Sequence, residues 1–195
     1  MNLKSIFALL LLIGIFAACK DKEEPVAKEV ETEDYYEFIK YNFSEYGLDI
    51  NMMLPDETAN IGASTKPEVK HDLDGFKWEI QIGPNFGFII DDFGEEKEKV
   101  SEKMANLKSV HFMDVNYLVK EKDFIIYETK LKISGEESSP ITNVKEHISY
   151  HVYAQKTIDG YTYVFRSREE GFPENIIEIM AKSFRSVKEN VALKD

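Results

Sequence analysis

Hydrophobic residues after position 34 recur mainly at every second position, which is typical of strands that bury one face. Such runs cover Leu48–Leu54, Phe76–Ile82, Phe86–Ile90, Phe112–Lys120, Phe124–Ile133, Ile148–Ala154 and Tyr161–Phe165. The last two runs flank the turn Thr157–Gly160 and predict a hairpin. Strand runs interrupted by single helices predict an α+β domain with an antiparallel sheet of about six or seven strands.

Two segments instead carry apolar residues at helical spacing. The first predicted helix covers Glu95–Ser109, and the pair Asp92 and Glu95 has the side chains of a capping box at its start. The second covers Pro173–Val187, where a proline suits the first turn of a helix. We expect these helices to flank the sheet, in one globular domain over residues 35–195.

The N-terminus has the pattern of a processing segment. Lys4 precedes the unbroken apolar or small run Ile6–Ala18, which ends at Cys19. The run is shorter than the roughly 20 residues that a membrane-spanning helix needs, and it matches the apolar region of a signal peptide. We therefore predict a signal peptide over residues 1–18.

The residues Phe16-Ala17-Ala18-Cys19 resemble the lipobox of bacterial lipoproteins, although Phe16 stands where that family usually has leucine. The resemblance implies that the thiol of Cys19 is diacylated and that the new amino terminus is acylated after cleavage. Each buried methylene contributes about 0.8 kcal/mol, so several acyl chains would hold the protein stably on a membrane. An ordinary secretory signal with a chance cysteine is the alternative. Because the chain has 1 Cys, an internal disulfide and a multi-cysteine metal site are excluded.

Residues 19–34 predict an acidic tether, because they are too polar to repay the entropy of ordering. The residues that follow the cysteine, Lys20, Asp21, Glu23 and Glu24, resemble the export signal that sends Bacteroidetes lipoproteins to the outer face of the outer membrane. Acidic tethers also serve solubility alone. The expected location is therefore the outer membrane, on either the cell surface or the periplasmic face.

The charge balance limits the partners. The chain has 24 Lys and Arg against 36 Asp and Glu, a net charge of −12. Nucleic acids and anionic headgroups need a basic patch, so neither is expected to bind the domain. The expected partners are the membrane, through lipid on Cys19, and a protein of the envelope.

The domain also has a remote resemblance to a known fold. A strand ending at Leu54-Pro55, a wide sheet and a last hairpin leading into a helix that ends at Ser183–Val187 resemble the PsbP-like fold. This fold also occurs in Mog-type Ran-binding proteins and in small bacterial lipoproteins, and it implies an α/β/α sandwich. That superfamily mostly binds or scaffolds and shares no catalytic residues, so the resemblance implies no active site.

Acidic side chains gather where Phe86–Ile90 meets the first predicted helix. Asp91, Asp92 and Glu95 could act as acid and base of an envelope hydrolase, provided that two of them converge in a cleft. A helix start also attracts acids, because its exposed amides and dipole end favour negative charge. The sequence leaves both interpretations open.

Histidines and arginines are the other candidates. His147 and His151 would lie about 13 Å apart on a strand, too far for one metal ion. We expect them on a solvated sheet face. Arg166 and Arg168 share a strand face, where they could receive a carboxylate or phosphate, or pair with acids such as Glu169.

A calcium loop and common catalytic motifs receive little support. Asp72, Asp74 and Gly75 match the centre of a calcium loop, but Lys70 and Gln81 stand at its ends, so a turn before a strand is expected. The chain has no Gly-x-Ser-x-Gly, Ser-x-x-Lys or phosphate-binding glycine loop. We therefore expect no metal, cofactor or catalytic residue. The leading hypothesis is a lipid-anchored, non-catalytic binding or assembly module, and the alternative is the carboxylate hydrolase.

Overall fold

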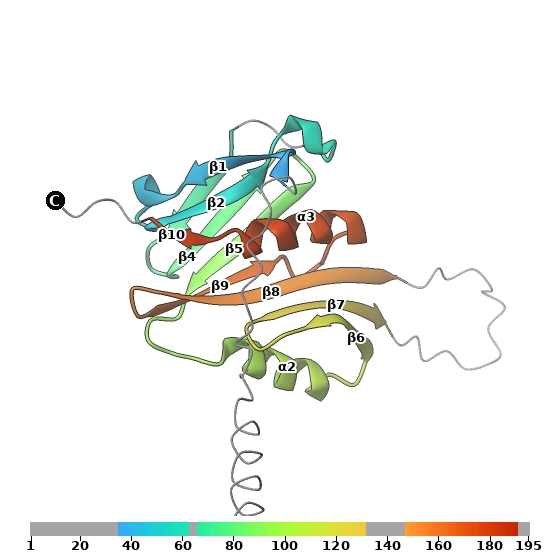
Figure 1. Cartoon of the computed structure of the whole chain (residues 1–195). Coiled ribbons are helices and arrows are strands. Elements are labelled where there is room, and N and C mark those ends of the chain that lie inside the picture. Colours follow the sequence, from blue (N-terminus) through green and yellow to red (C-terminus); the bar gives the residue numbers. More distant parts are fainter. Residues whose placement is uncertain (1–34, 63–65, 132–146, 191–195) are drawn as a thin grey trace, which may run out of the picture. The chain divides into compact units, whose positions relative to one another are not determined.

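A computed structural model of the chain describes residues 35–62, 66–131 and 147–190. Its main sheet has seven strands in the order β3-β4-β5-β9-β8-β7-β6, and every neighbouring pair is antiparallel (Figure 1). The strands are β3 (Glu68–Asp72), β4 (Lys77–Ile82), β5 (Phe86–Asp92), β6 (Met113–Lys120), β7 (Phe124–Leu131), β8 (Ile148–Ile158) and β9 (Tyr161–Ser167). The predicted α+β class with an antiparallel sheet is confirmed.

A second, smaller sheet was not predicted. It joins β1 (Phe38–Asn42), β2 (Ile50–Pro55) and β10 (Lys188–Glu189) in the order β1-β2-β10. Short 3₁₀ turns at Ser44–Tyr46 and Glu57–Ala59 flank β2. The run predicted at Leu48–Leu54 therefore belongs to this sheet, whereas β3, with its mostly exposed side chains, takes an edge of the main sheet.

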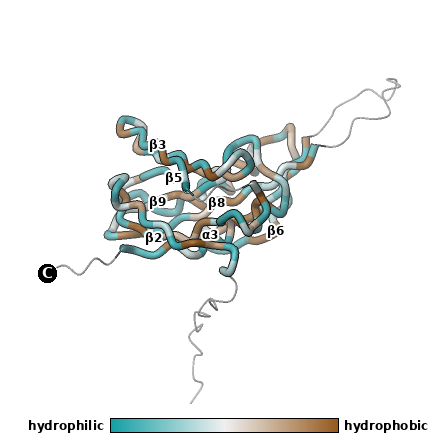
Figure 2. Tube along the Cα trace, turned by 90° about the horizontal axis from the view of Figure 1, so that it is seen from above, coloured by the Kyte–Doolittle hydropathy of each residue, from teal (hydrophilic) through white to brown (hydrophobic). Residues whose placement is uncertain are grey.

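One side of the main sheet, which we call the α3 face, is covered by α3 (Glu174–Arg185) together with the small sheet. Figure 2 shows α3 and β2 on the same side of β8 and β9. The main sheet, the small sheet and α3 all contribute apolar side chains to the core there. Its contributors include Ile80, Phe88 and Phe165 from the main sheet, Ile50 and Met52 from β2, and Ile177, Met180 and Phe184 from α3.

The opposite side, the α2 face, is covered in part by α2 (Lys99–Ser109). Its buried cluster contains Val100 and Leu107 from the helix and Ile125, Tyr127, Tyr153 and Val164 from β7, β8 and β9. The helices thus flank the sheet on its two faces, as expected (Figure 1).

The start of α2 corrects the predicted capping box. The helix begins at Lys99 instead of Glu95, and Asp92 is the last residue of β5, where its carboxylate accepts a hydrogen bond from the Gly94 amide at 2.7 Å. The amide of Val100 donates instead to the side chain of Gln155 on β8, at 3.2 Å. The cap was predicted wrongly because the intervening residues cross from the sheet to the helix, and a distant glutamine satisfies the helix end.

The other predicted elements agree more closely with the structure. Helix α3 lies within Pro173–Val187, with Pro173 as its N-cap residue. The β8–β9 hairpin forms, and Asp159 and Gly160 take positive φ angles of 50° and 86°, as its turn requires. Phe76 is an exception, because it is 63% exposed with φ 49° and so lies in the turn before β4.

The loop predicted at Gly135–Pro140 lies outside the described residues, as does the end of the run Phe124–Ile133. Over the part of the chain that the structure describes, no helix is both long and apolar enough to cross a membrane.

Candidate functional site

A cavity of about 520 Å³ separates part of α2 from the sheet. Its walls come from β5, β6, β7, β8, β9 and α2, so it opens on the α2 face, where the helix covers the strands incompletely. We call it the α2 cavity. The polar and aromatic side chains that define it are Asp91, Lys103, Tyr127, His151, Tyr153 and Arg166.

An ion pair crosses neighbouring strands at one wall. Asp91 on β5 and Arg166 on β9 lie on the same sheet face, and Nε of Arg166 donates to Oδ2 of Asp91 at 2.5 Å. A second bond runs from Nη2 to Oδ1 at 3.3 Å. The side chains are only 24% and 17% exposed, so the pairing is bidentate and largely shielded from water. The charge of this arginine is therefore already balanced.

Lys103 supplies a second cation, from the helix side. Its Nζ lies 5.8 Å from the centroid of the Tyr153 ring, and it forms no ion pair among the described residues. Burial lowers the pKa of Lys103, and the nearby charge of Arg166 lowers it further. The cavity thus holds a positive charge that the protein itself leaves unpaired.

Aromatic side chains form the floor. The rings of Tyr127 and His151 stack at 4.9 Å with an interplanar angle of 12°, and Nε2 of His151 lies 3.2 Å from the hydroxyl oxygen of Thr129. Burial, followed by the charge of Lys103, lowers the pKa of His151 to about 4, so its imidazole is neutral at neutral pH. Burial also raises the pKa of Tyr127, and it raises the pKa of Tyr153 to about 12, so both phenols keep their protons.

The expectation that both histidines lie on a solvated face was wrong for His151. This residue is 6% exposed, because its ring stacks on Tyr127 and lies close to Gly171 in the loop after β9, on the face that α2 partly covers. His147, in contrast, is exposed, with its Nε2 lying 3.1 Å from the hydroxyl of Ser149. The pattern of the strand alone could not indicate which face a helix would cover.

The three predicted carboxylates do not converge. Asp91 lines the α2 cavity and pairs with Arg166, whereas Asp92, its neighbour on the strand, points to the other face and binds the Gly94 amide. Glu95 is exposed in the connection to α2. No group of three or more His, Cys, Asp or Glu residues suited to a metal ion occurs within residues 35–62, 66–131 and 147–190.

The remaining sequence candidates have structural explanations. Asp72 accepts a hydrogen bond from the Gly75 amide at 3.0 Å in the turn between β3 and β4, so the turn interpretation is confirmed. Arg168 donates to the side-chain oxygen of Gln81, and Arg166 pairs with Asp91 instead of Glu169. Both arginines nevertheless line the α2 cavity, on the shared face that their spacing predicts.

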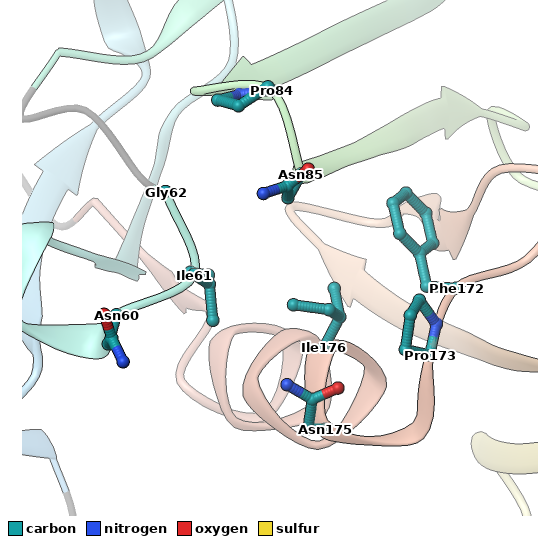
Figure 3. Close-up of a pocket in the computed structure, with 9 residues that line it drawn as sticks. All are labelled: Asn60, Ile61, Gly62, Pro84, Asn85, Phe172, Pro173, Asn175 and Ile176. Carbon is teal, nitrogen blue, oxygen red and sulfur yellow. The ribbon is translucent and has the colours of Figure 1, made fainter.

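A second cavity, of about 440 Å³, lies at the start of α3. Figure 3 shows Ile61 and Ile176 beside its opening, with Asn85 across from them and Asn175 below. Asparagine amides and apolar groups dominate its lining, and no ionisable side chain reaches it among the described residues. It therefore offers less chemistry than the α2 cavity, where charged, phenolic and imidazole groups meet.

The predicted lipidation residue, Cys19, and the export-signal residues Lys20, Asp21, Glu23 and Glu24 lie outside the described residues. They stay predictions. Comparison of the chain with protein-family models, with curated proteins and with solved structures found no significant match.

The sequence analysis missed several residues of this site, notably Lys103, Tyr127 and Tyr153. One signal was present for the lysine, because it stands beside Met104 on the helix stripe between Val100 and Leu107. A lysine that interrupts the buried stripe of a helix marks a place where a charge faces the sheet. The tyrosines offered no comparable signal, since aromatic residues on a strand usually fill a core.

Proposed function

We propose that this protein is a lipid-anchored, non-catalytic binding module of the cell envelope and that it holds its ligand in the α2 cavity. The observation that carries the proposal is the cavity itself, in which an unpaired Lys103 faces buried tyrosines across about 520 Å³ of unfilled space. A volume of this size falls within the roughly 300–1,000 Å³ range of small-molecule sites.

Binding is favoured over hydrolysis by the state of the polar groups. An acid–base pair needs two titratable groups within reach of one substrate, with pKa values near the working pH. Asp91 is occupied by Arg166, and His151 is neutral with a pKa of about 4. The separation of Asp91, Asp92 and Glu95 argues against the alternative of a carboxylate hydrolase.

A neutral fluorescent ligand, N-phenyl-1-naphthylamine, tests the binding function. We expect it to bind the purified protein, and we expect Met113→Trp, which puts a larger side chain in the cavity lining, to weaken this binding. Leu118→Trp is the matched control, because Leu118 lies on the same strand but is 45% exposed. Equal binding by both variants would overturn the assignment of the cavity as a binding site.

The anchor is proposed from the run of apolar residues that ends at Cys19. Mass spectrometry of the native N-terminal peptide should show an acylated cysteine. Cys19→Ala should move the protein out of the membrane fraction, since one acyl chain binds marginally and several bind stably. Unchanged fractionation of this variant would contradict the anchor.

The proposed location is the outer membrane, and the export-signal candidates favour the cell surface over the periplasmic face. Removal of the signal peptide takes away Lys4, so the mature chain is one charge more negative than the −12 of the whole sequence and is repelled by anionic headgroups. Protease added to intact cells should digest the domain. Replacing Lys20, Asp21, Glu23 and Glu24 with alanine should then protect it, and protection of the unmodified protein would indicate the periplasm.

We also propose that the domain has the PsbP-like architecture. The order of the last hairpin and closing helix supports it, as does the packing of one helix on each face of the main sheet. Ser186, in the segment that carries the resemblance, accepts a hydrogen bond from the Met53 amide at 2.8 Å and so ties the end of α3 to β2. An experimental structure compared with that superfamily would test the assignment.

A further inference from the structure

We propose that the α2 cavity selects small organic anions, namely an apolar body that carries one negative group such as a carboxylate, with Lys103 as the residue that binds the charge. This inference rests on the proposed binding function and names the ligand class for the same site. It draws on three features of the cavity, which are its charge, its hydrogen-bond donors and its size.

The charge of the cavity favours an anion. Arg166 is balanced by Asp91 in a bidentate pair, whereas Lys103 has no carboxylate partner among the residues described. Glu169, at the margin, is exposed to solvent, so water screens its charge. Arg168 also lines the cavity, but its guanidinium donates to the side-chain oxygen of Gln81. The ammonium of Lys103, unpaired in a partly buried site, is best balanced by one negative charge from the ligand.

The neutral groups around Lys103 are suited to the same ligand. The hydroxyls of Tyr127 and Tyr153 have no hydrogen-bond partner in the described part of the chain, and neither is among its fully buried unsatisfied atoms. Both phenols are protonated and can donate to an anion. His151 adds no charge at neutral pH, because its imidazole is uncharged. The site therefore offers phenol donors beside the Lys103 ammonium, and its two carboxylates are the paired Asp91 and the solvent-exposed Glu169 at the margin.

Size and lining determine the rest of the ligand. The space of about 520 Å³ exceeds what an inorganic ion would fill, and Leu107, Val110 and the tyrosine rings provide apolar contact. A polyphosphate would bring more negative charge than one unpaired lysine can balance. The molecule as a whole carries −12, so the cavity is a local positive site on a protein that repels anions at long range. Selection must therefore happen inside the cavity.

Two fluorescent ligands that differ by one charge test this inference. 8-Anilinonaphthalene-1-sulfonate carries a sulfonate on the aromatic body that N-phenyl-1-naphthylamine presents without charge. We expect Lys103→Gln to weaken binding of the sulfonate about tenfold or more, as loss of a charge-assisted hydrogen bond does, and to change binding of the neutral compound less than twofold. Lys103→Arg should restore most of the affinity for the sulfonate.

The matched control is Lys108→Gln, because Lys108 lies on the same helix and is exposed. It should leave both affinities unchanged. If the sulfonate binds Lys103→Gln as well as the unmodified protein, or if both ligands lose affinity equally, the anion inference is overturned while the binding function stands. If Met113→Trp lowers the affinity for neither ligand, the binding function itself is overturned.

Discussion

The two faces of the main sheet differ in how completely they are filled. On the α3 face, the helix buries Ile176, Ile177, Met180, Ala181, Ser183 and Phe184 against strands and the small sheet. On the α2 face, the helix buries Lys99, Val100 and Leu107, and a cavity remains beside them. Because neighbouring residues of a strand point to opposite faces, the same strands contribute to a dense core on one side and line the α2 cavity on the other.

The difference follows from the apolar stripes of the helices. Helix α3 packs a nearly continuous apolar stripe against the sheet, and the cavity of about 440 Å³ lies at its start, beside Ile176. In α2 a charged residue, Lys103, stands beside Met104 on the stripe, and the amide of Val100 at the helix start donates to Gln155. The α3 face is therefore the more closely packed, and the α2 face keeps a cavity lined by polar and charged side chains.

The largest expected effect comes from breaking the dense face. Phe184 is 0% exposed, and its ring centroid lies 5.2 Å from that of Phe88 and 5.8 Å from that of Phe165. Phe184→Ala should lower the free energy of unfolding by about 3–5 kcal/mol, through lost burial and the cavity that remains. Urea unfolding followed by circular dichroism measures it, and a loss below about 1 kcal/mol would contradict the account of this face.

The next effect concerns His151 and pH. Its pKa falls from the ordinary 6.5 to about 4 in the folded protein, chiefly through burial and then through Lys103, so the unfolded chain binds more protons between these values. Stability should therefore decrease as the pH falls from about 6.5 towards 4, by up to about 3 kcal/mol from this residue. Above pH 6.5 the residue adds no pH dependence.

The measurement is the free energy of unfolding at several pH values for the unmodified protein and for His151→Gln. The variant should lose less stability on acidification, and the difference between the two curves isolates the histidine from the carboxylates that titrate in the same range. Parallel curves would show that His151 is not buried as described.

A smaller effect is expected from the helix on the open face. Leu107 is 8% exposed and lines the α2 cavity. Leu107→Ala should cost about 2 kcal/mol or less, at the low end for such a change, because space already exists beside the side chain and less new void forms. A loss as large as that of Phe184→Ala in the same urea experiment would mean that both faces are packed alike.

The smallest change in stability should come from the residue with the largest effect on binding. Lys103→Met replaces an unpaired, partly buried ammonium with an apolar side chain, so stability should stay equal or rise within about 1 kcal/mol. Thermal unfolding, read beside sulfonate binding, measures both properties. A clear destabilisation would indicate a structural role for Lys103. It would contradict the proposal that this residue of the α2 face serves binding and not stability.

The sequence predicted the elements whose signals are local. The alternation at Ile80, Ile82 and Phe88 indicated strands that the structure places in the core, and the turn before Tyr161 indicated a hairpin that forms. The apolar stripe that includes Ile177 predicted α3 to within a few residues. These succeed because period, turn geometry and helix propensity operate over a few positions of the chain.

Other features depend on contacts between distant segments. β10 is two residues long, and it pairs with β2 from the far end of the chain, so no local pattern marks it. The carboxylate predicted to cap α2 instead binds the Gly94 amide, because Gln155 reaches the helix from β8. Likewise, Arg166 pairs with Asp91 across two strands that are far apart in sequence and adjacent in the sheet.

Composition and periodicity thus determined the fold class, the main strands and the closing helix, because the spacing of apolar residues within each strand or helix shows which face is buried. The α2 cavity was decided only by tertiary structure. The exposure of Lys103 and His151 depends on which part of the sheet α2 covers. It also depends on how much of the space between the helix and the sheet the α2 side chains fill. That fit is a property of two packed surfaces, and neither surface encodes it alone.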